Sequence, residues 1–206
     1  MNSVSVDSVM MSTPLRMDDE SFARLSTYVT REYGIKLPPA KKSMLESRLN
    51  KKVKSLGLAS YKEFLDFLFS EEAGSLDLLQ VIDLITTNKT DFFREPAHFQ
   101  FLSGQFLPPY INDQPRRSLK IWSAGCSTGE EPYSIIMTLE ELKKRLHDFT
   151  YSLLASDLST RVIQAAYQGI YEIEKTAPIP LDMKRQYFLR SNTNPGLVRV
   201  KPEYRK

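Results

Sequence analysis

Residues 121–134 read Ile-Trp-Ser-Ala-Gly-Cys-Ser-Thr-Gly-Glu-Glu-Pro-Tyr-Ser, and this order predicts a strand, a tight turn and a helix. An apolar pair leads into a run of small residues, and apolar residues at helical spacing follow the proline. Small residues let a backbone approach a ligand closely, and glycine also tolerates positive φ. Because open α/β sheets bind ligands at the carboxyl ends of their strands, this turn is a candidate binding site.

Two carboxylates, Glu130 and Glu131, stand where the predicted helix begins. They would repel a pyrophosphate, which is the usual ligand of a glycine-rich turn before a helix. A ligand that carries an ammonium group or ribose hydroxyls would find acceptors there. The alternative is that one of the two carboxylates only stabilises the positive end of the helix.

Composition sets limits on the class of protein. The 206 residues suffice for one or two domains, and 41% hydrophobic with 26% charged residues is typical of a globular chain. No apolar run approaches the roughly 18 residues that a membrane span needs. Cys126 is the single cysteine, so no intramolecular disulfide can form, which fits a reducing cytoplasm. Because neither histidine lies in a recognisable motif, we interpret Cys126 as a small turn residue rather than a nucleophile, and we expect no metal site.

The first part of the chain predicts a helical bundle. Possible caps such as Asp18 and Ser60, together with glycines, separate apolar stripes at helical spacing between positions 18 and 85. Such stripes bury themselves against one another. We therefore expect a disordered tail over residues 1–15 and a helical domain over residues 16–86.

The second part predicts an α/β domain over residues 119–206, after a linker over residues 87–118 that holds a helix ending at Pro108-Pro109. Asn194-Pro195-Gly196 lies between apolar pairs and predicts a hairpin or an extended excursion. The expected strands and helices alternate along the chain: strand Leu119–Ser123, helix Pro132–Leu146, strand Tyr151–Ser156 and helix Ser159–Tyr167.

The net charge of +3 conceals a strongly basic segment. Between Lys36 and Lys54 the sequence has seven basic residues and a single acid. At about 100° per residue, Lys41, Arg48 and Lys52 fall within roughly 40° of one another, beside the apolar arc of their helix. This stripe favours docking of an acidic protein partner. A solvated charged face is the alternative, and a nucleic-acid surface has less support because few aromatics accompany the stripe.

A second unusual string, Thr-Thr-Asn-Lys-Thr-Asp-Phe-Phe-Arg, occupies residues 86–94. Small hydroxyls and an amide stand here beside paired phenylalanines and an arginine. An ordinary capping and packing segment is one interpretation, and we expect Phe92 and Phe93 to pack in a core. Arg94 offers a planar fork that suits a carboxylate.

These two strings, in this order and about 28 residues apart, resemble the motifs of the chemotaxis receptor methyltransferases, the CheR family. Further matches are Ala155-Ser156-Asp157-Leu158-Ser159, Gly169-Ile170-Tyr171 and Tyr187-Phe188. The resemblance extends from about Asp18 to Lys206. It implies an α/β protein in which an all-α domain precedes a Rossmann-like methyltransferase domain.

The family resemblance implies a protein-glutamate O-methyltransferase. Such an enzyme transfers a methyl group from S-adenosylmethionine to glutamates on the cytoplasmic helices of chemoreceptors, which leaves S-adenosylhomocysteine. We therefore expect a cytoplasmic monomer that neither binds nucleic acid nor inserts into a membrane.

The resemblance also implies roles for individual residues. Arg94 would lie at the reacting centre, Glu130 would hold the cofactor's ammonium group, and Asp157 would accept from its ribose hydroxyls. An acid at the end of the second strand is also where Rossmann-type sheets read a ribose, although Asp157 could instead cap the next helix. Cofactor contacts are implied for Asn88, Thr90, Arg94, Ala124, Gly125, Glu130 and Asp157. Receptor docking is implied for Lys41, Lys42, Arg48, Lys51 and Lys52.

Methyltransferase sheets of this class have seven strands, whereas the sequence after Leu119 predicts two with clarity. We therefore expect an incomplete methyltransferase domain, as in a fragment or a truncated form, and we assign no small β-subdomain. A non-catalytic module of the same family that only docks on receptors is the alternative function.

Overall fold

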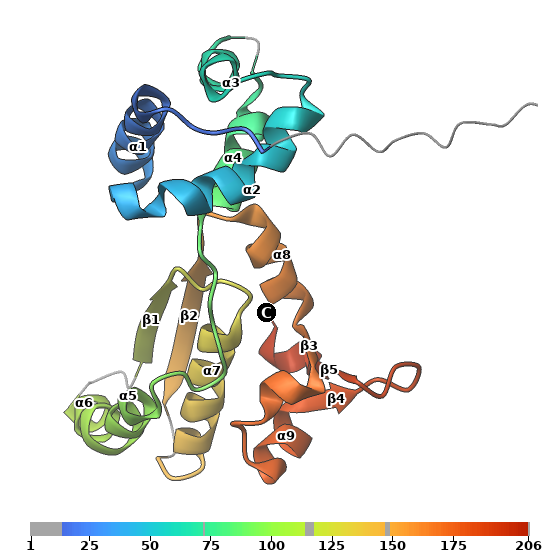
Figure 1. Ribbon diagram of the computed structural model, residues 1–206. Helices are drawn as coiled ribbons and strands as arrows, with labels where there is room; N and C mark the ends of the chain where they lie inside the picture. Colours follow the sequence, from blue (N-terminus) through green and yellow to red (C-terminus); the bar gives the residue numbers. More distant parts are fainter. Residues whose placement is uncertain (1–13, 72, 114–117, 147–148, 206) are drawn as a thin grey trace, which may run out of the picture. The chain divides into compact units, whose positions relative to one another are not determined.

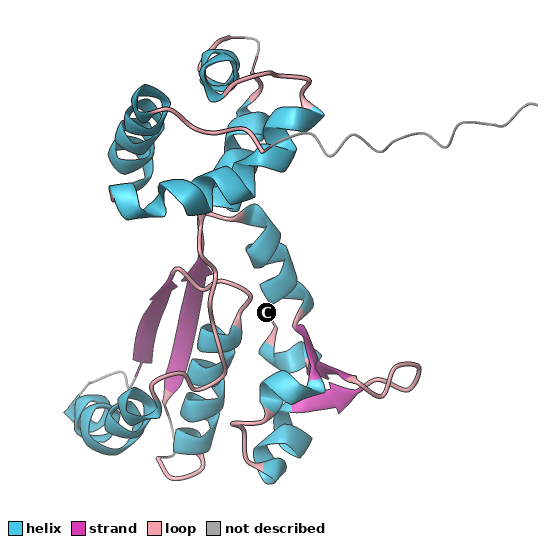
Figure 2. Ribbon diagram, in the orientation of Figure 1, coloured by secondary structure: helices cyan, strands magenta, loops and turns pink. Residues whose placement is uncertain are grey.

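The computed structural model describes residues 14–71, 73–113, 118–146 and 149–205. The chain divides into two compact units, Met1–Ile85 and Thr86–Lys206, and each is described by itself (Figure 1). Helices build the described part of the first unit, and helices and strands together build that of the second (Figure 2). Most of the predicted tail, residues 1–13, lies outside the described residues.

The first unit contains four α-helices among its described residues, with a 3-10 turn, Pro39–Lys41, before the second. All four contribute to one hydrophobic core, in which Leu25, Leu45, Phe64 and Ile82 are buried. The predicted helical bundle is thereby confirmed. The helices are α1 Asp19–Tyr33, α2 Lys42–Ser55, α3 Tyr61–Leu68 and α4 Ser75–Ile85.

Local sequence explains where these helices begin and end. The Asp18 carboxylate accepts a hydrogen bond from the Ser21 amide at 2.7 Å and caps α1. Gly34 ends α1 with φ of 69°, a conformation that glycine adopts without a steric penalty. Ser60 caps α3 through the amide of Glu63. Both predicted caps are therefore confirmed.

The second unit begins with a helical segment that the sequence predicted only in part. It comprises α5 Pro96–Phe101, a π-helical turn Leu102–Phe106 and α6 Leu107–Asp113. The prediction that this helix ends at Pro108-Pro109 is wrong. Both prolines lie inside this helical segment, which runs from the π-helical turn into α6 and ends at Asp113.

The predicted strand–helix–strand order is confirmed by β1 Ser118–Ala124, α7 Glu130–Lys143 and β2 Thr150–Ser156. The two strands pair in parallel, with Ala124 opposite Ser156 at their carboxyl ends. Leu139 and Leu142 of α7 are buried in the core that includes Leu119 of β1. The ends of both strands consequently meet at the turn that precedes α7.

A second, small sheet follows α8 Thr160–Gln168. Its strands, β3 Ile170–Glu172, β4 Phe188–Arg190 and β5 Leu197–Val200, are antiparallel in the order β3-β5-β4. The predicted hairpin around Asn194-Pro195-Gly196 is confirmed as β4–β5. The sequence did not allow a small β-subdomain to be assigned, and the structure has this antiparallel sheet in that part of the chain. A 3-10 turn Ile173–Thr176, α9 Leu181–Tyr187 and a last turn Pro202–Tyr204 complete the described unit.

None of the described helices combines the length and the apolar character needed to cross a membrane.

Candidate functional site

The turn between β1 and α7 is fastened to the end of β2. The amides of Gly125 and Cys126 both donate to the carbonyl oxygen of Ser156, at 2.8 and 2.9 Å. Gly125, Ser127 and Gly129 have positive φ values of 81°, 49° and 96°. The turn, which we call the loop (residues 123–131), therefore folds back over the carboxyl ends of the two parallel strands.

Two residues at the start of the loop are exposed to solvent. Ala124 and Gly125, which the resemblance places along the cofactor, are both exposed. A Cβ added to Gly125 would meet nothing within 4 Å. The requirement for glycine at this position is therefore conformational, set by its φ of 81°.

Asp157 directly follows β2 and holds the loop from one side. One carboxylate oxygen accepts from the Ser127 amide at 2.8 Å, and the other accepts from the Ser159 amide at 2.9 Å. Ser159 itself caps α8 through the amide of Val162. The side-chain cap of α8 is therefore Ser159, and each oxygen of Asp157 keeps a further lone pair for a ligand.

Asn88 holds the same loop residue from the other side. The Ser127 hydroxyl donates to the Asn88 carbonyl oxygen at 3.1 Å. The side-chain nitrogen of Asn88 is buried and finds no hydrogen-bond partner within the described residues. A buried donor without an acceptor costs on the order of 1–3 kcal/mol, which favours a ligand acceptor beside it. Thr90, two residues further along, is half-buried.

Arg94 is presented by a segment with unusual backbone geometry. Phe93 and Glu95, its neighbours, have φ values of 52° and 56°, and such strain in residues other than glycine is concentrated at functional sites. Phe92 is buried in a core, and the Phe93 amide donates to the Ser134 hydroxyl at 2.9 Å. The phenylalanines therefore anchor the segment, as predicted. The Arg94 side chain is exposed.

The guanidinium of Arg94 donates to the carbonyl oxygen of Lys89 at 2.9 Å. This bond stays within the segment that carries Asn88 and Thr90. The remaining N–H donors of the guanidinium are available to a carboxylate, because an arginine carries five in all.

The two carboxylates at the start of α7 have different environments. Glu130 is fully buried, and its carboxylate accepts from the Lys175 ammonium at 2.8 Å and from the Thr128 hydroxyl at 2.6 Å. Glu131 is exposed and accepts from the Ser123 hydroxyl at 2.7 Å. Lys175 was not found by sequence reasoning, because no motif marks it and 45 residues separate it from Glu130.

Cys126 is buried, with 2% of its surface exposed. Burial, and secondarily the negative charge of Asp157, raises the pKa of its thiol. A thiol in this environment stays protonated near neutral pH and is a poor nucleophile. In the described part of the chain, His, Cys, Asp and Glu form no group of three or more that could hold a metal ion.

The residues of the basic stripe predicted on α2 differ in their contacts with the rest of the first unit. Arg48 donates to the carbonyl oxygens of Leu84 and Ile85, at 3.4 and 2.9 Å, at the end of α4. The Lys52 ammonium pairs with the Asp77 carboxylate at 3.0 Å, also on α4. Two of the three stripe residues, Arg48 and Lys52, therefore contact α4, and their docking role stays a prediction.

The other predicted docking residues differ from these two. Lys42 pairs with Asp19 at 2.6 Å, whereas Lys41 and Lys51 are exposed. Among the five predicted docking residues, the fold thus presents Lys41 and Lys51 most openly to a partner.

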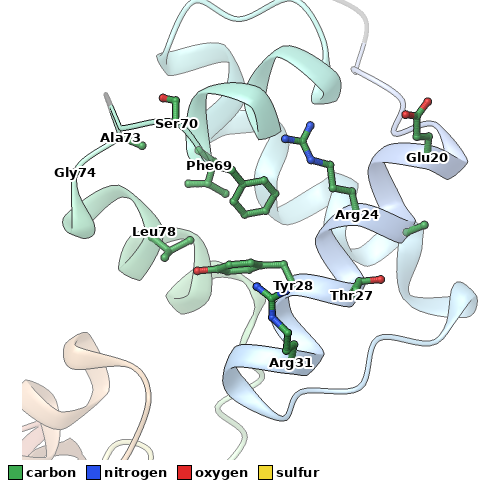
Figure 3. A pocket seen from close by; sticks show the side chains of 12 residues that line it. Glu20, Arg24, Thr27, Tyr28, Arg31, Phe69, Ser70, Ala73, Gly74 and Leu78 are labelled. Carbon is green, nitrogen blue, oxygen red and sulfur yellow. The ribbon is translucent and has the colours of Figure 1, made fainter.

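A hollow of about 880 Å³ lies in the first unit, between α1 and the connection from α3 to α4 (Figure 3). The Phe69 ring lies 5.1 Å from the Arg24 guanidinium carbon and 4.7 Å from the Tyr28 ring. Arg24 also pairs with Asp66. None of the site residues predicted from the sequence lines this hollow.

Two family models match the chain. Residues 20–86 match the model described as CheR methyltransferase, all-alpha domain, and residues 88–206 match CheR methyltransferase, SAM binding domain. S-adenosylmethionine is thus the cofactor of the domain type that contains the loop.

Named relatives agree with the family models. A chemotaxis protein methyltransferase of Borreliella burgdorferi is 37% identical over 84% of this chain and 62% of the relative. Chemotaxis protein methyltransferase 2 of Pseudomonas aeruginosa is 37% identical over 91% and 65%, and the chemotaxis protein methyltransferase of Escherichia coli is 35% identical over 95% and 66%. The chain spans slightly less than two thirds of the length of these relatives. It belongs to the CheR methyltransferase family, with the family's all-α domain followed by its S-adenosylmethionine-binding domain.

Proposed function

We propose that this chain acts as an S-adenosylmethionine-dependent protein-glutamate O-methyltransferase of chemotaxis, in the cytoplasm and as a monomer. Its substrates would be glutamates on the cytoplasmic helices of chemoreceptors. The observation that carries the proposal is the convergence on Ser127, whose amide binds Asp157 and whose hydroxyl binds the Asn88 carbonyl. Motif residues far apart in the sequence thereby meet at the strand ends where α/β sheets hold ligands.

The described residues fit the cofactor. Asp157 can accept from the ribose hydroxyls, and the unpartnered side-chain nitrogen of Asn88 can donate to an acceptor on the ligand. Ala124 and Gly125 are exposed, so a ligand can approach them closely. Glu130 already binds an ammonium group, that of Lys175, which is the chemistry that the amino group of the cofactor requires.

Methyl transfer to a carboxylate does not require the protein to supply a general acid or base. When bound, S-adenosylmethionine supplies a methyl group on a sulfonium, and its transfer to a carboxylate gives a methyl ester and S-adenosylhomocysteine. A glutamate with a pKa near ~4.3 is already ionised at neutral pH, so no general base is needed. The residues of this chain would act by alignment and by excluding water. We assign to Arg94 the orientation of the substrate carboxylate by a forked pair of hydrogen bonds.

Receptor docking would use the exposed cations of the first unit. Lys41 and Lys51 are exposed, and they would face an acidic receptor helix across a solvent-accessible contact. Such contacts mainly increase the association rate, and they weaken as salt is added. Lys42, Arg48 and Lys52 would contribute only if they exchanged their present partners.

Replacing Arg94 by alanine tests this proposal. We expect methyl transfer to a receptor fragment, measured as base-labile radioactive methyl groups, to fall roughly 10- to 100-fold, because a charged hydrogen bond contributes about 1.5–3 kcal/mol. The thermal stability should change little, because the side chain is exposed.

Arg161→Ala provides the matched control, since Arg161 is an exposed arginine on α8 of the same unit. It should leave both activity and melting temperature unchanged. Equal losses of activity and stability in Arg94→Ala would contradict the assigned role. Receptor binding without any base-labile label from the unaltered chain would favour the non-catalytic docking module.

A further inference from the structure

Glu130 has an ionic partner that comes from a distant segment. The Lys175 ammonium, on the 3-10 turn that follows β3, lies 2.8 Å from the Glu130 carboxylate. The side chain of Lys175 is 45% exposed, whereas that of Glu130 is not exposed at all. A buried carboxylate that loses its cation without a replacement is strongly destabilising. Glu130 therefore requires a cation at this position.

On the side that faces β3 and α8, the loop also makes close packing contacts that leave no free space. The Tyr171 hydroxyl of β3 donates to the Thr128 carbonyl oxygen at 2.7 Å. A Cβ on Gly129 would lie 2.8 Å from that hydroxyl and 2.9 Å from the Cβ of Ala166. The loop is therefore packed tightly against β3 and α8, and neither can recede without a wider rearrangement. Lys175 differs, because it has a flexible stem and already reaches solvent.

The lysine side chain and the amino group of S-adenosylmethionine present the same chemical group, a primary ammonium with three donors. Glu130 is the residue assigned to the amino group, yet it is buried and holds the ammonium of Lys175. We propose that Lys175 is a positioning residue that occupies the ammonium site on Glu130 and leaves it when the cofactor binds. This inference rests on the proposed function.

The exchange has two consequences. In the free chain Lys175 holds the Glu130 carboxylate in place. The incoming amino group must displace Lys175, which lowers the apparent affinity for the cofactor. By thermodynamic reciprocity, binding of the cofactor releases Lys175 and loosens the turn Ile173–Thr176. The small antiparallel sheet, which leads directly into this turn through β3, is thereby coupled to occupancy of the cofactor site.

Calorimetric titration with two ligands tests the exchange. S-adenosylhomocysteine carries the ammonium group, and 5′-methylthioadenosine lacks the whole amino-acid portion. For Lys175→Met we expect the affinity for S-adenosylhomocysteine to rise roughly 5-fold or more, and the affinity for 5′-methylthioadenosine to stay unchanged. Lys175→Arg keeps a cation and should bind both ligands like the unaltered chain. Lys184→Met removes an equal charge from α9 and serves as the control.

Hydrogen exchange gives a second readout that does not depend on a variant. Saturating S-adenosylhomocysteine should increase exchange at the amides of residues 175–179 in the unaltered chain, and 5′-methylthioadenosine should not. This measurement decides the question if Lys175→Met fails to fold.

The possible outcomes separate the inference from the function on which it rests. An unchanged or lower affinity of Lys175→Met for S-adenosylhomocysteine, or an equal gain for both ligands, overturns the exchange while the proposed function stands. Slower exchange at residues 175–179 with S-adenosylhomocysteine overturns it as well. If the unaltered chain and Lys175→Met both fail to bind S-adenosylhomocysteine, the proposed function falls together with the inference.

Discussion

Ser127 adopts a left-handed backbone with φ of 49°, which costs an ordinary residue on the order of 1 kcal/mol. Its amide and hydroxyl bind Asp157 and the Asn88 carbonyl, so the same residue that bears the strain connects two motif segments. Glycine at this position would relieve the strain and remove the hydroxyl. The strained backbone of Ser127 therefore coincides with a hydroxyl that holds the Asn88 segment.

Gly129 carries the sharpest steric constraint in the loop. Its φ is 96°, and a Cβ at this position would lie only 2.8 Å from the Tyr171 hydroxyl, so Gly129→Ala combines backbone strain with a clash. We expect a loss of roughly 2–4 kcal/mol in the unfolding free energy of the second unit, measured by urea denaturation.

Gly104→Ala is the matched substitution in the same unit. Gly104 lies in the π-helical turn, its Cβ would meet nothing within 4 Å, and its φ is not in the left-handed range. It should change the stability by less than about 1 kcal/mol. Similar effects of the two substitutions would show that the loop is not packed against β3 and α8 as described.

At the scale of elements, the periodic pattern of α2 predicted its buried face but not its contacts with a neighbouring helix. Helical spacing correctly predicted the buried arc that includes Leu45, Leu49 and Val53. It also put Arg48 and Lys52 beside that arc, and long side chains in such a border position can reach a neighbouring helix. Periodicity along one helix contains no information on which neighbour lies there. The contacts with α4 could therefore not be predicted.

Substitutions of Arg48 and Lys51 should distinguish a residue that stabilises the first unit from a residue that docks on a receptor. Arg48 binds the last carbonyl groups of α4, so Arg48→Ala should cost the first unit about 1–2 kcal/mol in a thermal or urea melt. Lys51 is exposed, and Lys51→Ala should leave the stability within about 0.5 kcal/mol.

For binding to an acidic receptor-helix fragment at low salt, Lys51→Ala should have the larger effect and Arg48→Ala the smaller one. Lys51→Ala should weaken the complex and reduce its salt dependence. A stable Arg48→Ala protein combined with unchanged binding by Lys51→Ala would contradict the assignment of these two roles.

Elements with strong local signals were predicted, and elements that depend on distant partners were not. Asp18 and Ser60 mark helix starts because a cap acts within a few residues. β3 and β4 have three residues each and are held by β5, so neither is long enough to show a period. The candidate site follows the same rule. Its motif residues stand out in the sequence, whereas Lys175 depends on a contact with Glu130 across 45 residues.

At the scale of the whole molecule, both units bury tyrosine side chains: Tyr61 in the first unit, and Tyr133, Tyr171 and Tyr187 in the second. Burial raises the pKa of Tyr61 in the first unit to about 12, with the charge of Glu46 adding to the effect. Burial likewise raises the pKa of Tyr133 in the second unit to about 12. An unfolded tyrosine titrates near ~10.

These pKa values predict alkaline sensitivity in both units. Between pH ~10 and ~12 the folded chain retains phenolic protons that the unfolded chain has lost, so the unfolding free energy falls as pH rises through this interval. Below pH ~10 both states are protonated at these groups, and the two tyrosines cause no pH dependence. Urea titrations from about pH 8 to pH 12 measure the slope, and Tyr61→Phe should reduce it in the first unit. A flat profile above pH ~10 would refute the prediction.

The central claim is that the loop and Asp157 form an S-adenosylmethionine site. Calorimetric titration of the chain with S-adenosylhomocysteine tests it most directly, with Asp157→Asn as the variant and Asp182→Asn, on the exposed face of α9, as the control. We predict binding at one site per chain, a loss of roughly 10-fold or more for Asp157→Asn because a charged hydrogen bond is removed, and no change for the control. An unaltered chain that gives no binding heat at millimolar ligand, or an Asp157→Asn variant that binds as tightly as the unaltered chain, would contradict the account.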